Sequence, residues 1–399
     1  MKPTDASMPV LERYDAATEP VQPAPPRLPL RSAWIEINTR RLRRNFEIVN
    51  AFKPRQVQVL SVVKDEGYGH GALTVGRAAL EAGAAYLGVA TLDEALALRA
   101  SGLDAPILLL GPQQETEMPW CVRHALTCAV QDAAQVKALA RVAARAHQRA
   151  PVHLKLNTGM NRYGVRWTDA LSLIELVLAQ SSLELEGVFS HFAMSDEADK
   201  SFALLQLERF QSVLAQLAAR RIHLKYRHLC NSGGLLDLPQ AHFDMVRIGL
   251  LPLGVYPSRV CRRLPGLAPV MTVKARIASI QAIGPGESVG YGMRYTAPNH
   301  RRIAVLPLGY GDGFPRVRNQ GGALIHGRCA PLVGGVAMDA LTVDITDIPE
   351  ARLWDEAVLL GRQGDAEITV QDVAQLKNSV SYDVLTGWRA RLPRVSVTE

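Results

Sequence analysis

The sequence Val57-Gln58-Val59-Leu60-Ser61-Val62-Val63-Lys64-Asp65-Glu66-Gly67-Tyr68-Gly69-His70-Gly71 joins a short apolar run to a polar, glycine-rich stretch. The run 57–63 is rich in valine and predicts a buried β-strand. The apolar pattern ends at Lys64. In α/β barrels the active site lies at the carboxyl ends of the strands, so a lysine in this position is a candidate catalytic group.

Seven similar apolar runs follow along the chain, and helix-length segments separate them. The cap residues Asn38-Thr39 predict a first helix, Thr91-Leu92-Asp93-Glu94 has the spacing of a capping box, and residues 133–147 have helical composition. Eight strands alternating with helices over about 210 residues predict a (β/α)8 TIM barrel. A doubly wound open sheet is the alternative, because periodicity does not prove closure. The further runs are residues 85–90, 106–110, 126–130, 152–156, 185–189, 227–229 and 245–248.

The pattern changes after about residue 266, where stretches rich in Val, Ile and Thr alternate with glycine turns. This pattern predicts a C-terminal all-β domain. The chain is therefore expected to be an α/β protein in three parts. These are a flexible, Pro-rich N-terminal arm (1–30), a barrel (31–265, with 31–37 as a strand of the β domain) and a C-terminal β domain (266–399).

Composition excludes several classes of protein. The 399 residues are 48% hydrophobic and 21% charged, with a net charge of +7, as in an ordinary globular protein. No apolar stretch is long enough for a membrane span, and the basic pairs are scattered, which disfavours nucleic-acid binding. The five cysteines are widely spaced and lack a CxxC, so neither disulfides nor a metal site are expected. The N-terminal arm lacks the apolar core of a secretory signal, and we expect a cytoplasmic protein.

Lys64 has a specific chemical interpretation. At the end of a buried strand its amine loses hydration, which lowers its pKa and allows it to form a Schiff base with a carbonyl compound. The alternative is a lysine that extends to the rim of the barrel, and the flanking Tyr68-Gly69-His70-Gly71 favours the chemical interpretation. The glycines do not match the spacing of a dinucleotide-binding loop.

Polar residues follow four other predicted strands. An arginine such as Arg162 can hold a carboxylate or phosphate through two parallel hydrogen bonds, although a structural arginine is the alternative. Loops after the seventh and eighth strands commonly bind phosphate in barrels, which suits Ser232 and Gly249. The polar strand ends are residues 155–164, 190–192, 228–233 and 246–249.

Together these segments resemble the alanine racemase family, a class of pyridoxal phosphate enzymes with a barrel and a β domain. The resemblance covers residues 31–395. The matching strings, in order, are Val62-Val63-Lys64 with Tyr68-Gly69-His70-Gly71, Thr158-Gly159-Met160-Asn161-Arg162, Ser190-His191-Phe192, Asn231-Ser232, Val246-Arg247-Ile248-Gly249 and Met338-Asp339.

The resemblance implies two catalytic bases. Lys64 would hold pyridoxal phosphate as an internal aldimine and serve as one base, and Tyr291 would be the second, reaching the site from the other subunit of a head-to-tail dimer. Bases on opposite faces account for racemisation, because one removes the Cα proton and the other returns one to the opposite face.

The resemblance also implies the binding residues. A cation at Arg247 would keep the pyridine nitrogen unprotonated, a feature of the racemases, whereas decarboxylases of this architecture carry a carboxylate there. His191 would link Arg247 to Tyr291. The remaining cofactor-binding residues would be Tyr68, Asn231, Ser232, Ile248, Gly249 and Tyr382; Arg162 and the other subunit's Met338 would hold the substrate carboxylate, with Lys155, carbamylated in some relatives, and Asp339 in support.

The expected function is therefore interconversion of L- and D-alanine, which supplies D-alanine for peptidoglycan. The bulky Tyr382 favours a small substrate side chain. A serine or broad-specificity racemase is the alternative, and a decarboxylase or a non-catalytic cofactor carrier of the same fold is less favoured. The chain departs from the family pattern at Leu253, where tyrosine is usual, at Ala340, where glutamine is common, and at Asp65-Glu66-Gly67.

Overall fold

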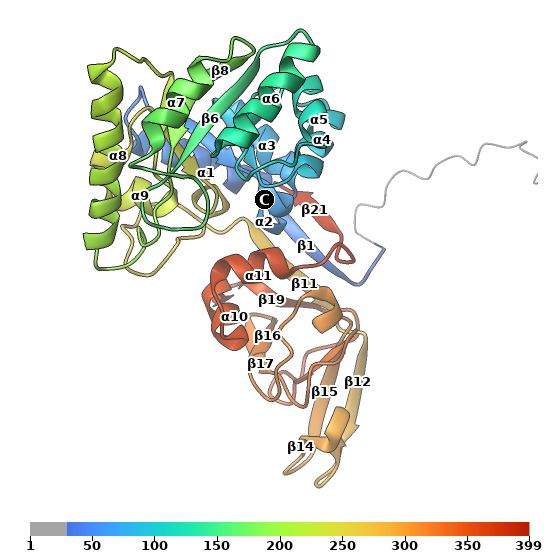
Figure 1. The fold of residues 1–399 in the computed structure, drawn as a ribbon. Coiled ribbons are helices and arrows are strands. Elements are labelled where there is room, and N and C mark those ends of the chain that lie inside the picture. Colours follow the sequence, from blue (N-terminus) through green and yellow to red (C-terminus); the bar gives the residue numbers. More distant parts are fainter. Residues whose placement is uncertain (1–29, 399) are drawn as a thin grey trace, which may run out of the picture.

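The computed structural model describes residues 30–398, and the expected N-terminal arm lies outside them except for Leu30. A ring of parallel strands with helices around it forms the larger part of the molecule (Figure 1). Each of the eight apolar runs overlaps one of these strands, which confirms the barrel prediction. In spatial order they are β10 (Met245–Ile248), β2 (Gln58–Val62), β3 (Tyr86–Val89), β4 (Ile107–Leu109), β5 (Thr127–Val130), β6 (Ala150–Asn157), β8 (Leu183–Phe189) and β9 (Tyr226–His228).

The two ends of this sheet meet between β9 and β10. The Asp244 amide donates to the Arg227 carbonyl over 3.1 Å, and the Arg247 amide donates to the Cys230 carbonyl over 2.9 Å. The Arg227 guanidinium also binds the Asp244 carboxylate through two nitrogens, at 2.6 and 2.8 Å. These contacts distinguish a barrel from an open doubly wound sheet.

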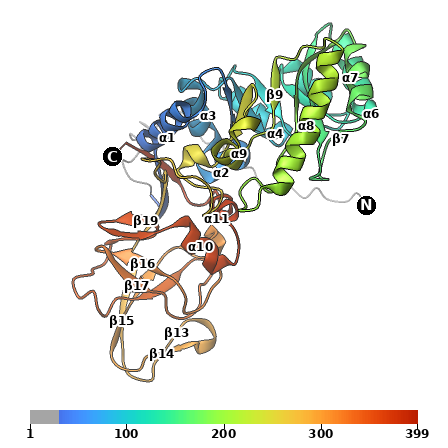
Figure 2. The same cartoon turned by 90° about the vertical axis from the view of Figure 1, so that its left-hand side faces the viewer.

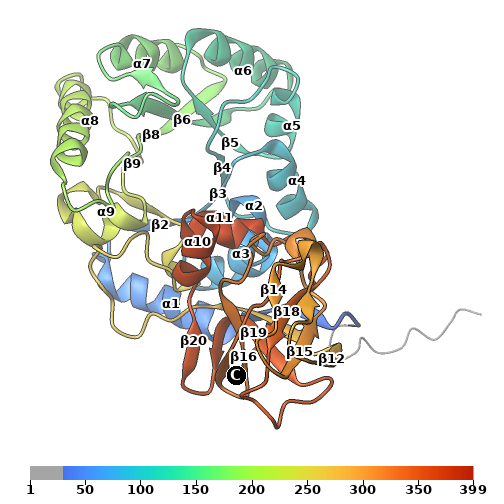
Figure 3. The same cartoon turned by 90° about the horizontal axis from the view of Figure 1, so that it is seen from below.

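Helices surround the ring, as the end-on view in Figure 3 shows. The predicted caps are present: the Asn38 side chain accepts from the Arg41 amide over 2.8 Å, and Thr91 and Glu94 form a capping box. The helices of this part are α1 (Thr39–Phe52), α3 (Ala72–Glu81), α4 (Leu92–Ala100), α5 (Met118–Arg123), α6 (Ala133–Arg145), α7 (Ala170–Leu178), α8 (Ser201–Ala219) and α9 (Ser232–Asp237), and a short strand β7 (Val165–Arg166) pairs with β6.

The C-terminal domain consists mainly of strands (Figure 2). Its largest sheet runs β17 (Arg328–Pro331), β16 (Gly322–Ile325), β19 (Glu356–Gln363), β11 (Met271–Arg276), β1 (Ala33–Asn38) and β21 (Arg394–Val397), with β20 (Ala366–Ile368) paired to β19. The strand β1 therefore joins a sheet made of C-terminal residues. The smaller sheets are β12 (Ser279–Ile283), β15 (Arg301–Leu306) and β18 (Leu341–Asp344), and β13 (Ser288–Val289) with β14 (Tyr295–Thr296).

Two short helices lie between β20 and β21 in the chain, α10 (Val370–Lys377) and α11 (Ser381–Gly387). The weak helical periodicity of the sequence did not indicate them. In Figure 3 α11 lies at the rim of the barrel, and it carries Tyr382 towards the ends of the strands. A domain that consists mainly of strands thus contributes a helix to the barrel mouth.

The turn α2 (Lys64–Gly69), which begins one residue after the end of β2, is left-handed. Four consecutive residues, Asp65 to Tyr68, have φ between 51° and 59°. L-residues avoid this conformation at a cost of roughly 1–2 kcal/mol each. The turn is held by a 2.6 Å hydrogen bond from the Asp65 amide to Glu94 and by a 2.7 Å bond from the Gly71 amide to the Glu66 carbonyl.

Within residues 30–398, none of the helices is both long and apolar enough to cross a lipid bilayer. The same residues contain no cluster of His, Cys, Asp and Glu side chains arranged to hold a metal ion.

Candidate active site

A cavity of about 500 Å³ lies at the carboxyl ends of the barrel strands. It brings together side chains from almost every strand end that the sequence singled out. The predicted residues that line it are Lys64, Tyr68, Lys155, Arg162, His191, Asn231, Ser232, Arg247, Gly249 and Tyr382.

Lys64 is the second residue after β2 and is partly buried. Burial, and then the nearby Arg162 cation, lower the pKa of Lys64 below its usual value, although Glu94 and Asp65 oppose the shift. A lowered pKa raises the neutral fraction of the amine, and the neutral amine is the form that attacks an aldehyde. The local environment of Lys64 therefore favours Schiff-base chemistry.

Arg247 is held rigidly on β10. Its guanidinium donates to His228 Nδ1 over 3.1 Å, to His191 Nδ1 over 3.0 Å and to the Ser190 carbonyl over 2.7 Å. Burial lowers the pKa of Arg247 to about 10, which still leaves the side chain charged at neutral pH. Because Arg247 donates to both imidazoles, each of them carries its proton on Nε2.

The hydrogen bonds continue from Arg247 through the barrel. His228 Nε2 donates to His153 Nδ1 over 2.8 Å, and His153 Nε2 then lies 3.8 Å from the Glu186 carboxylate. The neighbouring His153 ring has the largest influence in lowering the pKa of Glu186 to about 2, and Tyr86 also donates to this carboxylate. The Arg247 cation is therefore connected to a buried chain that ends in an anion.

Lys155 and Phe189 form one wall of the cavity. The Lys155 amine donates to the Leu110 carbonyl over 3.0 Å and lies 5.0 Å from the Phe189 ring centre. Burial, followed by the nearby cations Arg247, Arg162 and Lys64, lowers the pKa of Lys155 to about 7. The sequence interpretation missed Phe189, which also stacks on His228; its position as the last residue of β8 is the signal that could have revealed it.

Tyr68, Ser232 and Gly249 meet at the other end of the cavity. The Gly249 amide lies 3.4 Å from Ser232 Oγ. A Cβ on Gly249 would lie only 2.7 Å from the Tyr68 hydroxyl, so the backbone passes here as closely as a glycine permits. Tyr382 adds a second ring, with its centre 6.2 Å from that of Tyr68. Hydroxyl groups and a backbone amide that converge beside a glycine form a suitable cradle for a phosphate group.

The charge of the cavity fits the same ligand. Four cationic side chains, Lys64, Lys155, Arg162 and Arg247, line it, and within the described residues no Asp or Glu belongs to its lining. A cofactor phosphate and a substrate carboxylate would supply the missing negative charges. These residues therefore fit pyridoxal phosphate together with an amino acid.

Four of the predicted site residues lie elsewhere. Tyr291 (82% exposed) and Met338 (52% exposed), with Asp339, line a separate cavity of about 830 Å³ in the C-terminal domain. In Figure 2 the neighbouring β13–β14 hairpin lies at the end of that domain remote from the barrel. Ile248 is buried in β10 and does not line the Lys64 cavity. Within one chain, then, the two expected bases are not brought together.

Comparison with known proteins agrees with the fold and the cavity. The alanine racemase N-terminal domain matches residues 37–257, and the C-terminal domain of the same family matches residues 270–396. The alanine racemase of Carboxydothermus hydrogenoformans is 41% identical over 92% of this chain and 100% of its own length. The solved alanine racemase of Clostridium difficile 630 superposes with a TM-score of 0.88 at 30% identity, covering 92% of this chain and 96% of that one. A histidine racemase from Leuconostoc mesenteroides has a TM-score of 0.85 at 29% identity, with coverage of 93% and 99%.

Pyridoxal phosphate-dependent racemases, which are isomerases, are the class of enzyme that this fold and this cavity define. The family matches extend over nearly all of the described chain, and the chain belongs to the alanine racemase family.

Proposed function

We propose that this protein interconverts L- and D-alanine. The observation that carries the proposal is that Lys64 and Arg247 line the same cavity. Within the described residues, this lining has no acidic side chain. Pyridoxal phosphate held in this cavity would withdraw electrons from the Cα of an amino acid joined to it and would so make the Cα hydrogen acidic. Arg247 places a permanent cation, held by two histidines, where the pyridine nitrogen is expected, which disfavours the stronger electron withdrawal that a protonated nitrogen provides.

The remaining lining residues orient the substrate. Arg162 extends into the cavity from the loop after β6 and can hold the carboxylate, while Tyr68, Ser232 and the Gly249 amide hold the phosphate. Tyr382 restricts the space beside Cα and thereby favours a small side chain. Two competing substrates are to be tested. Serine is the alternative that the sequence left open, and histidine is included because the histidine racemase has the same fold.

The experiment on substrate follows purified holoenzyme with L-alanine in deuterated water. We expect optical rotation to decay to zero while deuterium enters Cα, because a two-base reaction takes the returning proton from solvent-exchangeable groups. Serine and histidine at equal concentration are expected to react more slowly, and a higher kcat/KM for either would overturn the preference for alanine.

The second base in the proposal is Tyr291 of a second copy of this chain. Its exposure and its separation from Lys64 in one chain support a homodimer with shared sites, because a site built from one chain would lack a base on the opposite face.

A mixing experiment tests the shared site. Lys64→Ala and Tyr291→Phe are each expected to be nearly inactive. After the two variants are unfolded and refolded together, half of the dimers are mixed and each has one intact site of two, so activity should return to about a quarter of the wild-type value. A mixture that stays inactive, although mixed dimers form, would contradict the proposal.

We further propose that the enzyme acts in the cytoplasm and supplies D-alanine for peptidoglycan. Expression in a bacterium that requires external D-alanine for growth tests this role, with Lys64→Ala as the control. Growth without D-alanine is expected for the wild type only.

A further inference from the structure

A second cavity, of about 480 Å³, lies between the barrel and the C-terminal sheet and shares no lining residue with the active site. Its walls come from the segment after β10, the strands β11, β19 and β20, the first turn of α10, and α11. Half of the lining residues have apolar side chains. The apolar residues are Leu253, Val255, Leu267, Pro269, Met271, Leu360, Ile368, Val370 and Leu385.

His70 is a buried polar residue of this lining, 1% exposed. Its Nδ1 lies 2.8 Å from the Tyr68 carbonyl, which fixes the ring proton on Nδ1 and leaves Nε2 as an acceptor. Nε2 has no hydrogen-bond partner among the described residues, and burial lowers the pKa of His70 to about 4, so the ring is neutral at pH 7. A buried acceptor without a donor costs roughly 1–3 kcal/mol, and a ligand hydroxyl that reaches Nε2 from the cavity would satisfy it.

The exposed residues around this cavity are mainly cationic. Arg259 and Arg263 are exposed, and the Arg259 side chain has no hydrogen bond or ion pair with any described residue. The acidic residue of the lining, Glu367, is already paired with Arg362 over 2.9 Å. The free charge at this cavity is therefore positive, which suits a carboxylate on the ligand.

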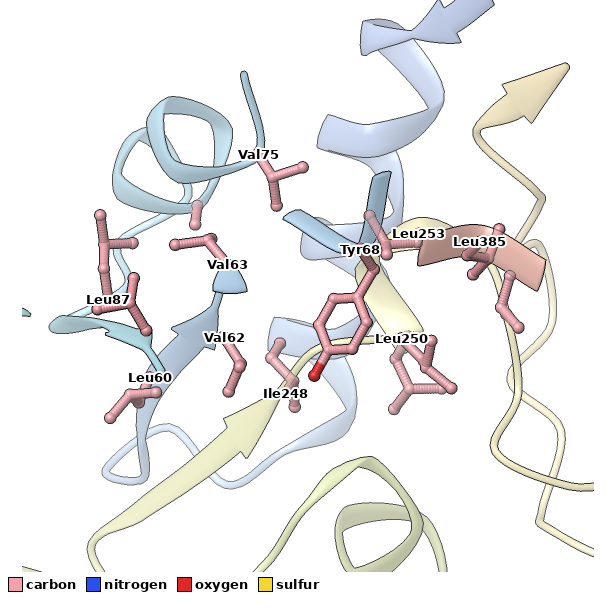
Figure 4. Packing of buried hydrophobic residues seen from close by; sticks show 14 of the residues in the cluster. Leu60, Val62, Val63, Tyr68, Val75, Leu87, Ile248, Leu250, Leu253 and Leu385 are labelled. Atoms are coloured by element: carbon pink, nitrogen blue, oxygen red, sulfur yellow. The ribbon is translucent and has the colours of Figure 1, made fainter. Parts of the chain in front are cut away.

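The cavity and the active site lie on opposite sides of the same two elements. The turn α2 places Tyr68 in the active site, and the residue that follows the turn, His70, lines the second cavity. The helix α11 likewise places Tyr382 in the active site and Leu385 in the second cavity. In Figure 4 the Tyr68 hydroxyl points away from Leu253 and Leu385. A Cβ on Gly69 would meet the Leu385 carbonyl at 2.2 Å, so α2 and α11 pack without free space.

We propose that this second cavity is a binding site for an aryl carboxylate that carries a hydroxyl group, and that its occupancy holds Tyr68 and Tyr382 in their cofactor-binding arrangement. The ring packs on the apolar walls, the hydroxyl donates to His70 Nε2, and the carboxylate meets Arg259. Because the ligand touches α2 and α11 from behind, it stabilises the phosphate end of the active site and slows loss of the cofactor.

Calorimetry on the cofactor-loaded full-length protein tests binding with two probes, 3-(4-hydroxyphenyl)propionate and 3-phenylpropionate. Neither has an amino group, so neither can form an imine with the cofactor. We expect saturable binding of the hydroxylated probe, with the other about tenfold weaker for lack of the bond to His70. Equal affinities, or no saturable binding at millimolar probe, would overturn the assignment.

Three variants locate the site. Arg259→Ala is expected to weaken binding about tenfold. Arg262→Ala is the matched control, because Arg262 is a neighbouring exposed arginine that lies over Phe52 and does not line the cavity; its affinity should equal that of the wild type. Leu253→Tyr should fill the cavity and abolish binding. Equal losses in the Arg259 and Arg262 variants would contradict a site in this cavity, and this comparison does not depend on whether Leu253→Tyr folds.

The coupling has its own measurement. The hydroxylated probe is expected to slow release of pyridoxal phosphate, followed by absorbance during dilution, by about fivefold. The effect of the hydroxylated probe on turnover can be measured only if the protein has the proposed racemase function. This effect should be non-competitive with respect to L-alanine. Competition with L-alanine would place the probe in the active site and refute the proposal, whereas absence of racemase activity with binding retained would refute the proposed function alone.

Discussion

Gly249→Ala tests whether Tyr68 and Gly249 together form the phosphate cradle. The new methyl group would lie 2.7 Å from the Tyr68 hydroxyl and from Cε2 of its ring. The ring cannot retreat easily, because Tyr68 is buried and Leu250 lies beside its ring (Figure 4). Displacing it weakens a hydrogen bond to a charged phosphate, worth roughly 1.5–3 kcal/mol, so the cofactor should bind about 10- to 100-fold more weakly.

The assay titrates apoprotein with pyridoxal phosphate and follows absorbance. Gly111→Ala is the control, because Gly111 lines the same cavity but a Cβ there meets nothing closer than 3.5 Å. If Gly249→Ala acts through the tyrosine, its penalty and that of Tyr68→Phe should not add in the double variant. Wild-type affinity in Gly249→Ala, or fully additive penalties, would refute the reasoning.

Three further predictions concern stability, each measured by urea unfolding of the apoprotein. The pKa of the Glu186 carboxylate is lowered to about 2 in the folded protein, so this group stabilises the fold at pH values above its unfolded pKa and loses the contribution as pH falls towards 2. Glu186→Gln should therefore lower the free energy of unfolding by about 1–2 kcal/mol at pH 7 and by much less at pH 3. An equal loss at both pH values would contradict this. The pKa of Lys155 is about 7 in the folded protein, compared with 10.5 in the unfolded chain, so Lys155 destabilises the fold while it is charged. This penalty disappears as pH rises from 7 towards 10. Lys155→Met should therefore stabilise the protein more at pH 6.5 than at pH 9.5. Asp65→Gly should gain about 1 kcal/mol by relieving the left-handed backbone, whereas Asp65→Ala should gain nothing.

Most barrel strands could be predicted because they are short apolar runs that are buried on both faces. The closing contact between Arg227 and Asp244 could not, because it joins two strands through a pair that sequence spacing does not reveal. The helices α10 and α11 are only eight and seven residues long, too short for a clear period of 3.6.

The predicted site residues that follow strands line one cavity, because the ends of parallel strands converge at one face of the barrel. Side chains alternate between the two faces of a strand, which explains why Ile248 does not line the cavity. Arg247 faces the cavity, so its neighbour Ile248 faces away from it. Phe189 and the chain from His153 to Glu186 were missed because buried aromatic and polar residues inside a barrel have no motif of their own. The role of Tyr291 rests on family resemblance, since no pattern in the sequence connects it with Lys64.

The left-handed turn beside Lys64 also has a consequence for mutational tolerance. Asp65 and Glu66 are exposed, and exposed positions ordinarily accept almost any residue. Here the backbone is the constraint, and valine, isoleucine and threonine are the residues least compatible with it, while glycine, asparagine and aspartate are the most compatible. In a saturation library these two surface positions should therefore show a substitution profile as narrow as that of the barrel core, selected by handedness and not by burial.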